Sequence, residues 1–312
     1  MSGGDQRALG PLCLAAAAGA AALLAAQKLG KLVSKRSATP ADGSKLAAAA
    51  VDGASLWAAG PPHPDWQPPQ KMAVPFDTDA MHTVDPSQLP GDVLYPLIIS
   101  AIVPRPIAFV STLSASGVGN LAPFSYFNVM AHNPPHVCIG FAASRLRPHG
   151  RKDTLFNLLE TGEFVVNIMS EWFIEAANYC CGNFEYGEDE MELSGLTPLP
   201  SVKVKPPRVK ESAVHMECQL RHSYEVKDNK GAVTGTIVIG EVVMMHVHEG
   251  VAGRSPSGKL VVSMQHYQPV SRLGGNTYAR TSGMYDLPRP DRGPDQKELA
   301  YTSRPSAAVL SN

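Results

Sequence analysis

Short apolar runs separated by turn-forming residues dominate the middle of the chain. Residues 106–113 and 120–130 flank the turn-forming segment 114–117, and this arrangement predicts a β-hairpin. Further strands are predicted over five apolar or alternating runs: 98–103, 137–142, 164–169, 215–224 and 236–247. Because these strands are short and mostly joined by hairpins, the pattern favours a closed antiparallel barrel.

Two segments have helical spacing instead. In residues 154–161, Leu155 and Leu158 share one face, and Gly162 is placed to end the helix. Residues 171–181 form a second helical pattern. The sequence therefore predicts a mainly β domain with helices on the outside of the barrel.

Composition divides the chain into four parts. Residues 1–36 hold one acid and five bases around an apolar run, 12–26, that is shorter than the roughly 20 residues of a bilayer span. This segment is expected to be a targeting sequence or a weak membrane anchor, and an Ala-rich disordered tail is the alternative. Residues 37–75 are expected to be a Pro/Ala-rich linker, 76–286 the folded domain and 287–312 a flexible tail.

Charge and cysteine content limit the kinds of protein and of cellular compartment that fit the sequence. The 28 acids nearly balance the 27 bases, so no whole-molecule field attracts nucleic acid, and membrane contact is expected only through the N-terminal segment. Five cysteines without framework spacing argue against a disulfide scaffold and favour a reducing compartment. The adjacent Cys180 and Cys181 are interpreted as packing residues. The compartment itself stays open, an organelle or a membrane surface.

Two tempting motifs are rejected. Residues 117–122 match the G-x-G-x-x-A dinucleotide fingerprint, but Pro123 and a β-rich run follow, and no acid occurs between Gly119 and Lys152. These glycines are expected to form a hairpin turn. His246 and His248 could share one strand face, but the one candidate third ligand nearby, Glu249, points elsewhere if the strand continues, so no metal site is predicted. Hydrolase and Walker motifs are also missing from the sequence.

Residues 151–154 (Arg-Lys-Asp-Thr) directly precede the predicted helix 154–161. Helix N-terminal amides, a lysine and a hydroxyl suit a phosphate monoester. The alternative is an ordinary helix cap by Asp153 or Thr154, preceded by solvated bases.

Several segments together resemble one known family, the flavin reductase-like, FMN-binding split-barrel family. The resemblance runs from about residue 94 to 282 and rests on these stretches: 104–112 (PRPIAFVST), 119–128 (GNLAPFSYFN), 133–135 (NPP), 151–154 (RKDT), 161–167 (TGEFVVN), 193–196 (LSGL), 204–209 (VKPPRV) and 272–280 (RLGGNTYAR). Their order and spacing make the match specific, and the subgroup it resembles most contains flavoredoxin and the reductase components of two-component flavin monooxygenases.

The resemblance implies a six-stranded Greek-key split barrel that forms a homodimer and holds FMN near the subunit interface. It implies a set of cofactor-binding residues, in which Lys152 and Thr154 hold the phosphate: Ser111, Thr112, Asn120, Leu121, Ala122, Ser125, Asn128, Arg151, Lys152, Asp153, Thr154, Tyr278 and Arg280. Arg105 is expected either to stabilise the reduced flavin electrostatically or to be a structural residue. The polar loop 226–234 is expected to affect access to the flavin.

The resemblance also implies an NAD(P)H-dependent flavin reductase that needs no catalytic nucleophile, because hydride passes directly between cofactors. A monooxygenase or another redox protein is the expected partner. Two alternatives use the same barrel: a flavoredoxin-like electron carrier that holds FMN tightly, and an oxidase of the pyridoxamine-phosphate type.

Overall fold

The computed structural model describes residues 56–58, 60–292 and 299–300. The predicted targeting segment 1–36 lies outside these residues, so its role stays a prediction. Within the described part of the chain, no helix is long and apolar enough to cross a membrane. Leu56–Ala58, inside the predicted linker, pairs with Met284: the Ala58 N–H donates to the Met284 carbonyl, and the Met284 N–H donates to the Leu56 carbonyl.

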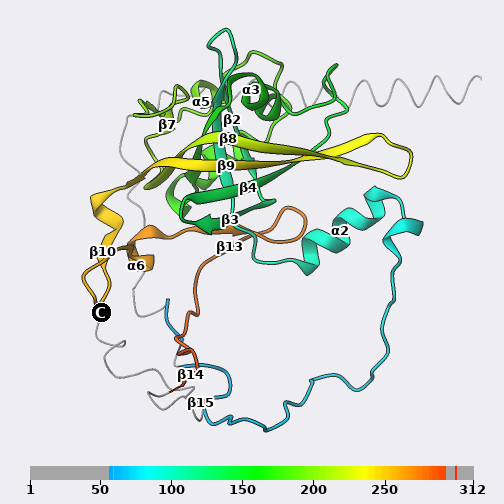
Figure 1. Cartoon of the computed structure of the whole chain (residues 1–312), viewed down its shortest axis with the longest axis vertical. Helices are drawn as coiled ribbons and strands as arrows, with labels where there is room; N and C mark the ends of the chain where they lie inside the picture. Colours follow the sequence, from blue (N-terminus) through cyan, green and yellow to red (C-terminus); the bar gives the residue numbers. More distant parts are fainter. Residues whose placement is uncertain (1–55, 59, 293–298, 301–312) are drawn as a thin grey trace, which may run out of the picture. The chain divides into compact units, whose positions relative to one another are not determined.

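One seven-stranded antiparallel sheet forms the body of the fold (Figure 1). Its strands, in spatial order, are β2 (Gly119–Phe124), β1 (Ala108–Leu113), β5 (Glu163–Ile168), β8 (Val214–Lys227), β9 (Val233–Val247), β4 (Pro135–Ala142) and β3 (Phe127–His132). In Figure 1 the long β8–β9 ribbon runs on past the other strands, so the polar loop at its tip lies away from the centre of the sheet. The predicted mainly β fold is confirmed.

Short helices and two-stranded ladders make up the rest of the described secondary structure. The helices are η2 (Pro86–Gln88), α2 (Gly91–Ala101), α3 (Asp153–Thr161), η3 (Glu171–Phe173), α4 (Ile174–Tyr179), α5 (Glu190–Leu193), η4 (Glu249–Val251) and α6 (Met264–Tyr267). The ladders are β6 (Pro198–Leu199) with β7 (Arg208–Val209), β10 (Ala252–Arg254) with β11 (Leu260–Val262), β12 (Val270–Arg272) with β13 (Tyr278–Arg280), and β14 (Asp291–Arg292) with β15 (Leu299–Ala300). The helix predicted over 171–181 is observed as η3 followed by α4.

The sheet curls until its two end strands meet. β2 pairs with β1 and β3 pairs with β4, and the two end strands are joined directly by the bend at Ser125 and Tyr126. At this β2–β3 seam the Gly140 N–H of β4 donates to the Tyr126 carbonyl over 2.7 Å, which continues the β3–β4 ladder into the bend. The prediction of one strand over 120–130 was wrong because the chain changes pairing partner in the middle of that run.

The apolar run 98–103 is the second correction, since it was predicted as a strand and its first four residues belong to α2. A short apolar run can be either a strand or one face of a helix. Here the run is the last part of a helix that begins at Gly91, directly after the N-cap Pro90. α2 contains Pro96, and Ile99 is its single buried residue.

Two apolar clusters hold the sheet and its helices together. The barrel interior contains Val110, Ile139, Phe141, Phe164, Cys218 and Val238, and is covered by Leu155 and Leu158 of α3. The second cluster packs α4 and α5 on the outside of β1 and β2 and includes Phe109, Leu121, Met169, Phe173, Ala177 and Met191. α3 confirms the helix predicted over 154–161, and Gly162 ends it in the left-handed region at φ 72°, as the pattern predicts.

Candidate functional site

A cleft of about 290 Å³ lies beside the β2–β3 seam, with walls from β2 and β4. Its walls come from segments that are far apart in the sequence. They are residues 120 and 122–126 of β2 and the following bend, Gly140 and Ala142 of β4, the loop residues 144, 146 and 147, the start of α3 at 152–154, residues 180–184 after α4, Glu190 of α5, Tyr95 of α2, Ile107, Arg272 and Tyr278. The fold therefore brings the N-terminus of α3 and one edge of the barrel to the same opening.

The N-terminus of α3 forms one end of the cleft. Lys152 is the N-cap, without a side-chain capping bond, so neither Asp153 nor Thr154 caps the helix. The Thr154 hydroxyl is buried and accepts a hydrogen bond from Asn120 Nδ2 at 2.8 Å, which fixes α3 against β2. Lys152 is exposed and has no ion pair among the described residues. A helix N-terminus with an unpaired lysine is a site for an anionic group.

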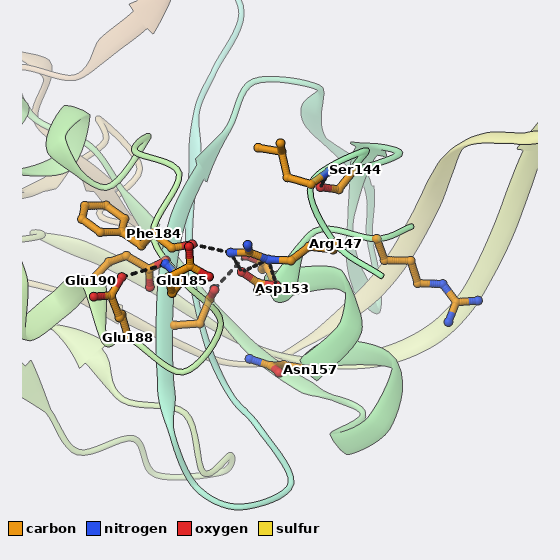
Figure 2. A network of polar contacts seen from close by, with 12 residues as sticks. Ser144, Arg147, Asp153, Asn157, Phe184, Glu185, Glu188 and Glu190 are labelled. Carbon is orange, nitrogen blue, oxygen red and sulfur yellow. Dashed lines mark hydrogen bonds and ion pairs between the residues drawn. The ribbon is translucent and has the colours of Figure 1, made fainter. Parts of the chain in front are cut away.

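Arg147 and Asp153 form a tight pair at the same end (Figure 2). The Arg147 guanidinium donates to both Asp153 oxygens, with Nε–Oδ1 at 2.7 Å and Nη2–Oδ2 at 2.6 Å, and also to the Phe184 carbonyl. The Asp153 carboxylate raises the pKa of Arg147, so this cation is permanent. Sequence reasoning missed Arg147 because its only signal, a position among several bases before α3, does not distinguish it from its neighbours.

Glu190 brings a buried carboxyl to the cleft wall. Its side chain is 6% exposed, and Oε2 accepts the Leu121 N–H of the free β2 edge at 2.8 Å. Burial raises the pKa of Glu190 to about 7, the charges of Asp153 and Asp189 act in the same direction, and hydrogen bonds oppose them. Sequence reasoning missed this residue as well, since the acidic stretch 188–192 has the pattern of a solvated surface.

Polarisable and aromatic groups complete the wall. The Arg272 guanidinium lies 4.4 Å from the centre of the Tyr278 ring, and the Tyr278 hydroxyl donates to Asn178 Oδ1 at 2.8 Å. Cys180 and Cys181 both line the cleft as free cysteines. Burial raises the pKa of Cys180 to about 11, so Cys180 remains a protonated thiol at neutral pH.

The structure brings seven of the predicted cofactor-binding residues together at this cleft: Asn120, Ala122, Ser125, Lys152, Asp153, Thr154 and Tyr278. The other six lie elsewhere. Ser111 and Thr112 line a separate cavity of about 440 Å³. Leu121 is buried in the core, and Asn128 is exposed on β3.

Two of the arginines predicted to bind the cofactor form ion pairs with surface acids instead. Arg151 lies 3.5 Å from the carboxylate of Glu225 in β8, and Arg280 pairs with Glu171. Neither arginine lines the cleft as it stands.

Arg105 has a structural environment. Its guanidinium donates to the carbonyls of Ile99 and Ile102 at the end of α2, to the Leu273 carbonyl, and to Ser125 Oγ at 3.3 Å. The side chain is buried and does not line the cleft. Of the two predicted roles, this geometry favours the structural one.

His246 of β9 and His248, which follows the strand, also have protein partners. His246 Nε2 lies 2.7 Å from Oε1 of the buried Glu217, and His248 Nδ1 accepts the Gly250 N–H. Glu217 in turn accepts the N–H groups of Val202 and Lys203. Within the part of the chain that the structure describes, no group of three potential ligands is positioned to hold a metal ion.

Comparison with known proteins identifies the family of this chain. Residues 100–271 match the family model described as flavin reductase like domain. The chain is 37% identical over 211 residues to YwrF, an uncharacterised protein of Bacillus subtilis strain 168, and the match covers 67% of this chain and 100% of that protein.

Solved structures agree in fold. Nitrilotriacetate monooxygenase component B from Bacillus cereus superposes with a TM-score of 0.62 at 35% identity, covering 67% of this chain and 100% of that one. A structure from Shewanella frigidimarina described as having a split barrel domain superposes with a TM-score of 0.56 at 23% identity, covering 67% of this chain and 100% of that one. The sheet closed at the β2–β3 seam is thus a split barrel, and the chain belongs to the flavin reductase-like domain family.

Proposed function

We propose that this protein is a flavin reductase that binds FMN in the cleft and reduces it with NADH or NADPH. Membership of the flavin reductase-like family supports a flavin-linked oxidoreductase role. The observation that carries the finer proposal is the joining, in one cleft, of an anion-binding helix N-terminus with the edge of a β-strand and aromatic walls. A planar ring with a phosphorylated side chain matches that combination.

The residues present fit FMN. Lys152 and the first-turn amides of α3 would hold the phosphate, because these amides have no partner inside the helix. The backbone of residues 122–125 would meet the ring system, with Tyr278 limiting the access of water. Bound FMN supplies the hydride acceptor, so the protein's contribution is position and electrostatics. Arg272, held against Tyr278, brings a positive charge to the same cleft.

Replacing Lys152 by methionine is expected to raise the dissociation constant for FMN about tenfold to hundredfold, the loss of one charge-assisted hydrogen bond. Riboflavin, which has no phosphate, is expected to bind Lys152→Met and the original protein equally. Arg151→Met is the matched control, since the neighbouring Arg151 pairs with Glu225 outside the cleft. Fluorescence titration with FMN and with riboflavin measures these affinities. Equal weakening by the two substitutions, or weaker riboflavin binding, would contradict the phosphate assignment.

The function itself is tested by an anaerobic titration. The purified chain is mixed with FMN, NADH or NADPH is added, and the visible flavin absorption is followed. Rapid bleaching that depends on the protein supports the reductase and identifies its nucleotide. Bound flavin that stays oxidised would leave a flavoredoxin-like carrier or an oxidase, and no flavin binding would overturn the proposal.

The similarity to component B of a nitrilotriacetate monooxygenase supports the further proposal that reduced flavin passes to a monooxygenase partner. A mixture of this protein with such an oxygenase should hydroxylate substrate only when a nicotinamide nucleotide is present.

We also propose that the protein is a homodimer, with the second copy covering β3. This edge strand exposes Val129 at 63% and Met130 at 59%. α2 adds the exposed apolar side chains Tyr95, Leu97 and Ile98. Exposed apolar side chains gathered on an edge strand and a helix are typical of a protein–protein interface.

Val129→Glu is expected to convert the dimer to a monomer, because it places a charge inside an apolar contact. Light scattering after size-exclusion chromatography measures the mass. Val74→Glu is the control, since Val74 is equally exposed at 66% but lies outside the sheet. A dimer that survives Val129→Glu would place the interface elsewhere.

A further inference from the structure

Glu190 is an acid in the wall of a cleft whose proposed ligand is an anion. The carboxyl lines the cleft, is almost fully buried, and binds the Leu121 N–H at 2.8 Å. No ion pair compensates it among the residues that the structure describes. Its charge state therefore matters for any charged ligand that enters.

The titratable and charged groups around Glu190 come from four segments. α3 contributes Asp153, the residue before α5 contributes Asp189, and the end of α4 contributes the neutral thiol of Cys180. The loop before α3 contributes Arg147, whose guanidinium is already bound to both oxygens of Asp153 (Figure 2). The charge of Arg147 is thus already neutralised by Asp153, while Lys152 and Arg272 also line the cleft. Burial and the two neighbouring acids, Asp153 and Asp189, favour an uncharged Glu190.

We propose that the cleft holds its anionic ligand with Glu190 protonated, so that FMN binding above neutral pH takes up one proton at this residue. The inference rests on the proposed function and concerns the regulation of the same site. The proton comes from solvent and converts the Glu190 carboxylate to a carboxylic acid, and no other bond changes. A phosphate dianion entering the cleft adds negative charge, which an ionised, buried Glu190 would repel.

The expected pH dependence follows from the protonation state before binding. Burial raises the pKa of Glu190 to about 7, so below neutrality the residue is already protonated and binding takes up nothing. Above neutrality each further pH unit costs up to a factor of about ten in affinity, until the pKa of the complex is reached.

Glu190→Gln separates this role from a purely structural one. The glutamine carbonyl oxygen can still accept the Leu121 N–H, so the tie between α5 and β2 is kept while the titration is lost. Glu192→Gln is the matched control, because Glu192 is an exposed acid of the same short helix and does not line the cleft.

The experiment is an FMN fluorescence titration of the full chain at about pH 7 and about pH 8.5, where the phosphate, with its second pKa near 6, stays a dianion. We expect the dissociation constant of the original protein and of Glu192→Gln to rise about tenfold between the two values, and that of Glu190→Gln to rise less than about twofold. Calorimetry at about pH 8 in two buffers of different protonation enthalpy should report the uptake of close to one proton, absent in Glu190→Gln.

The outcomes distinguish the two proposals. An equal pH dependence in Glu190→Gln, or FMN binding without proton uptake, overturns the inference and leaves the flavin site standing. A protein that binds no FMN at either pH overturns the proposed function, and the inference with it.

Discussion

Arg105→Met is expected to lower the free energy of unfolding by about 4 kcal/mol, the cost of leaving one buried and two part-buried acceptors without a donor. Methionine keeps the apolar stem of the side chain but cannot donate. The carbonyls of Ile102 and Leu273, each 2.8 Å from the guanidinium, then lose their partner, as does the Ile99 carbonyl. The effect is large because one side chain ties the end of α2 to the segment after β12.

Urea unfolding followed by circular dichroism measures this change. Arg221→Met is the control: Arg221 pairs with Glu241 on the surface of the sheet, where its side chain is 44% exposed, and its loss should change stability by less than about 1 kcal/mol. If Arg105→Met keeps the stability and loses FMN affinity instead, Arg105 has the electrostatic role and the structural assignment is wrong.

The second large effect is a pH dependence of stability caused by Glu190. In the folded protein its pKa is about 7, against a usual value of 4.5. The native state therefore binds more protons than the unfolded state between these values, and stability falls as pH rises through this window. The loss amounts to about 3 kcal/mol and is complete just above pH 7.

Glu190→Gln removes this loss. Urea unfolding without flavin, at about pH 5 and about pH 8, should give the substituted protein a stability advantage over the original that grows by about 2–3 kcal/mol between the two conditions. Glu192→Gln should show no such growth. Parallel behaviour of the original protein and Glu190→Gln would mean that Glu190 is ionised in the folded state well below neutrality.

The sequence predicts a barrel strand correctly where the whole apolar run pairs as a single strand. Residues 106–113, 137–142 and 164–169 are mostly apolar and become β1, β4 and β5. β1 and β5 are buried on both faces, and β4 is buried on one face and half-buried on most of the other. Prediction fails where the decisive fact is tertiary. No feature of the sequence 120–130 indicates that its first half pairs with β1 and its second half with β4.

The candidate site shows the same contrast between residues with a local sequence signal and residues placed by the tertiary structure. Lys152 and Thr154 could be found because a helix N-terminus has a local signature. Arg147 and Glu190 could not, because they reach the cleft only when the loops before α3 and α5 fold against β2. Conversely, Arg280 lies in a family motif but pairs with Glu171 on the surface, a contact between segments that no spacing rule connects.

The dispersed origin of the cleft wall has a consequence for the life of the protein in a cell. The wall draws on segments from Tyr95 to Tyr278, so it is complete only when all of these segments are folded together. A ligand that binds there binds the native state alone, and at a concentration one hundred times its dissociation constant it adds about 2.7 kcal/mol of stability. Because proteases remove the unfolded fraction, flavin binding in this cleft should make the amount of protein that accumulates follow the supply of flavin.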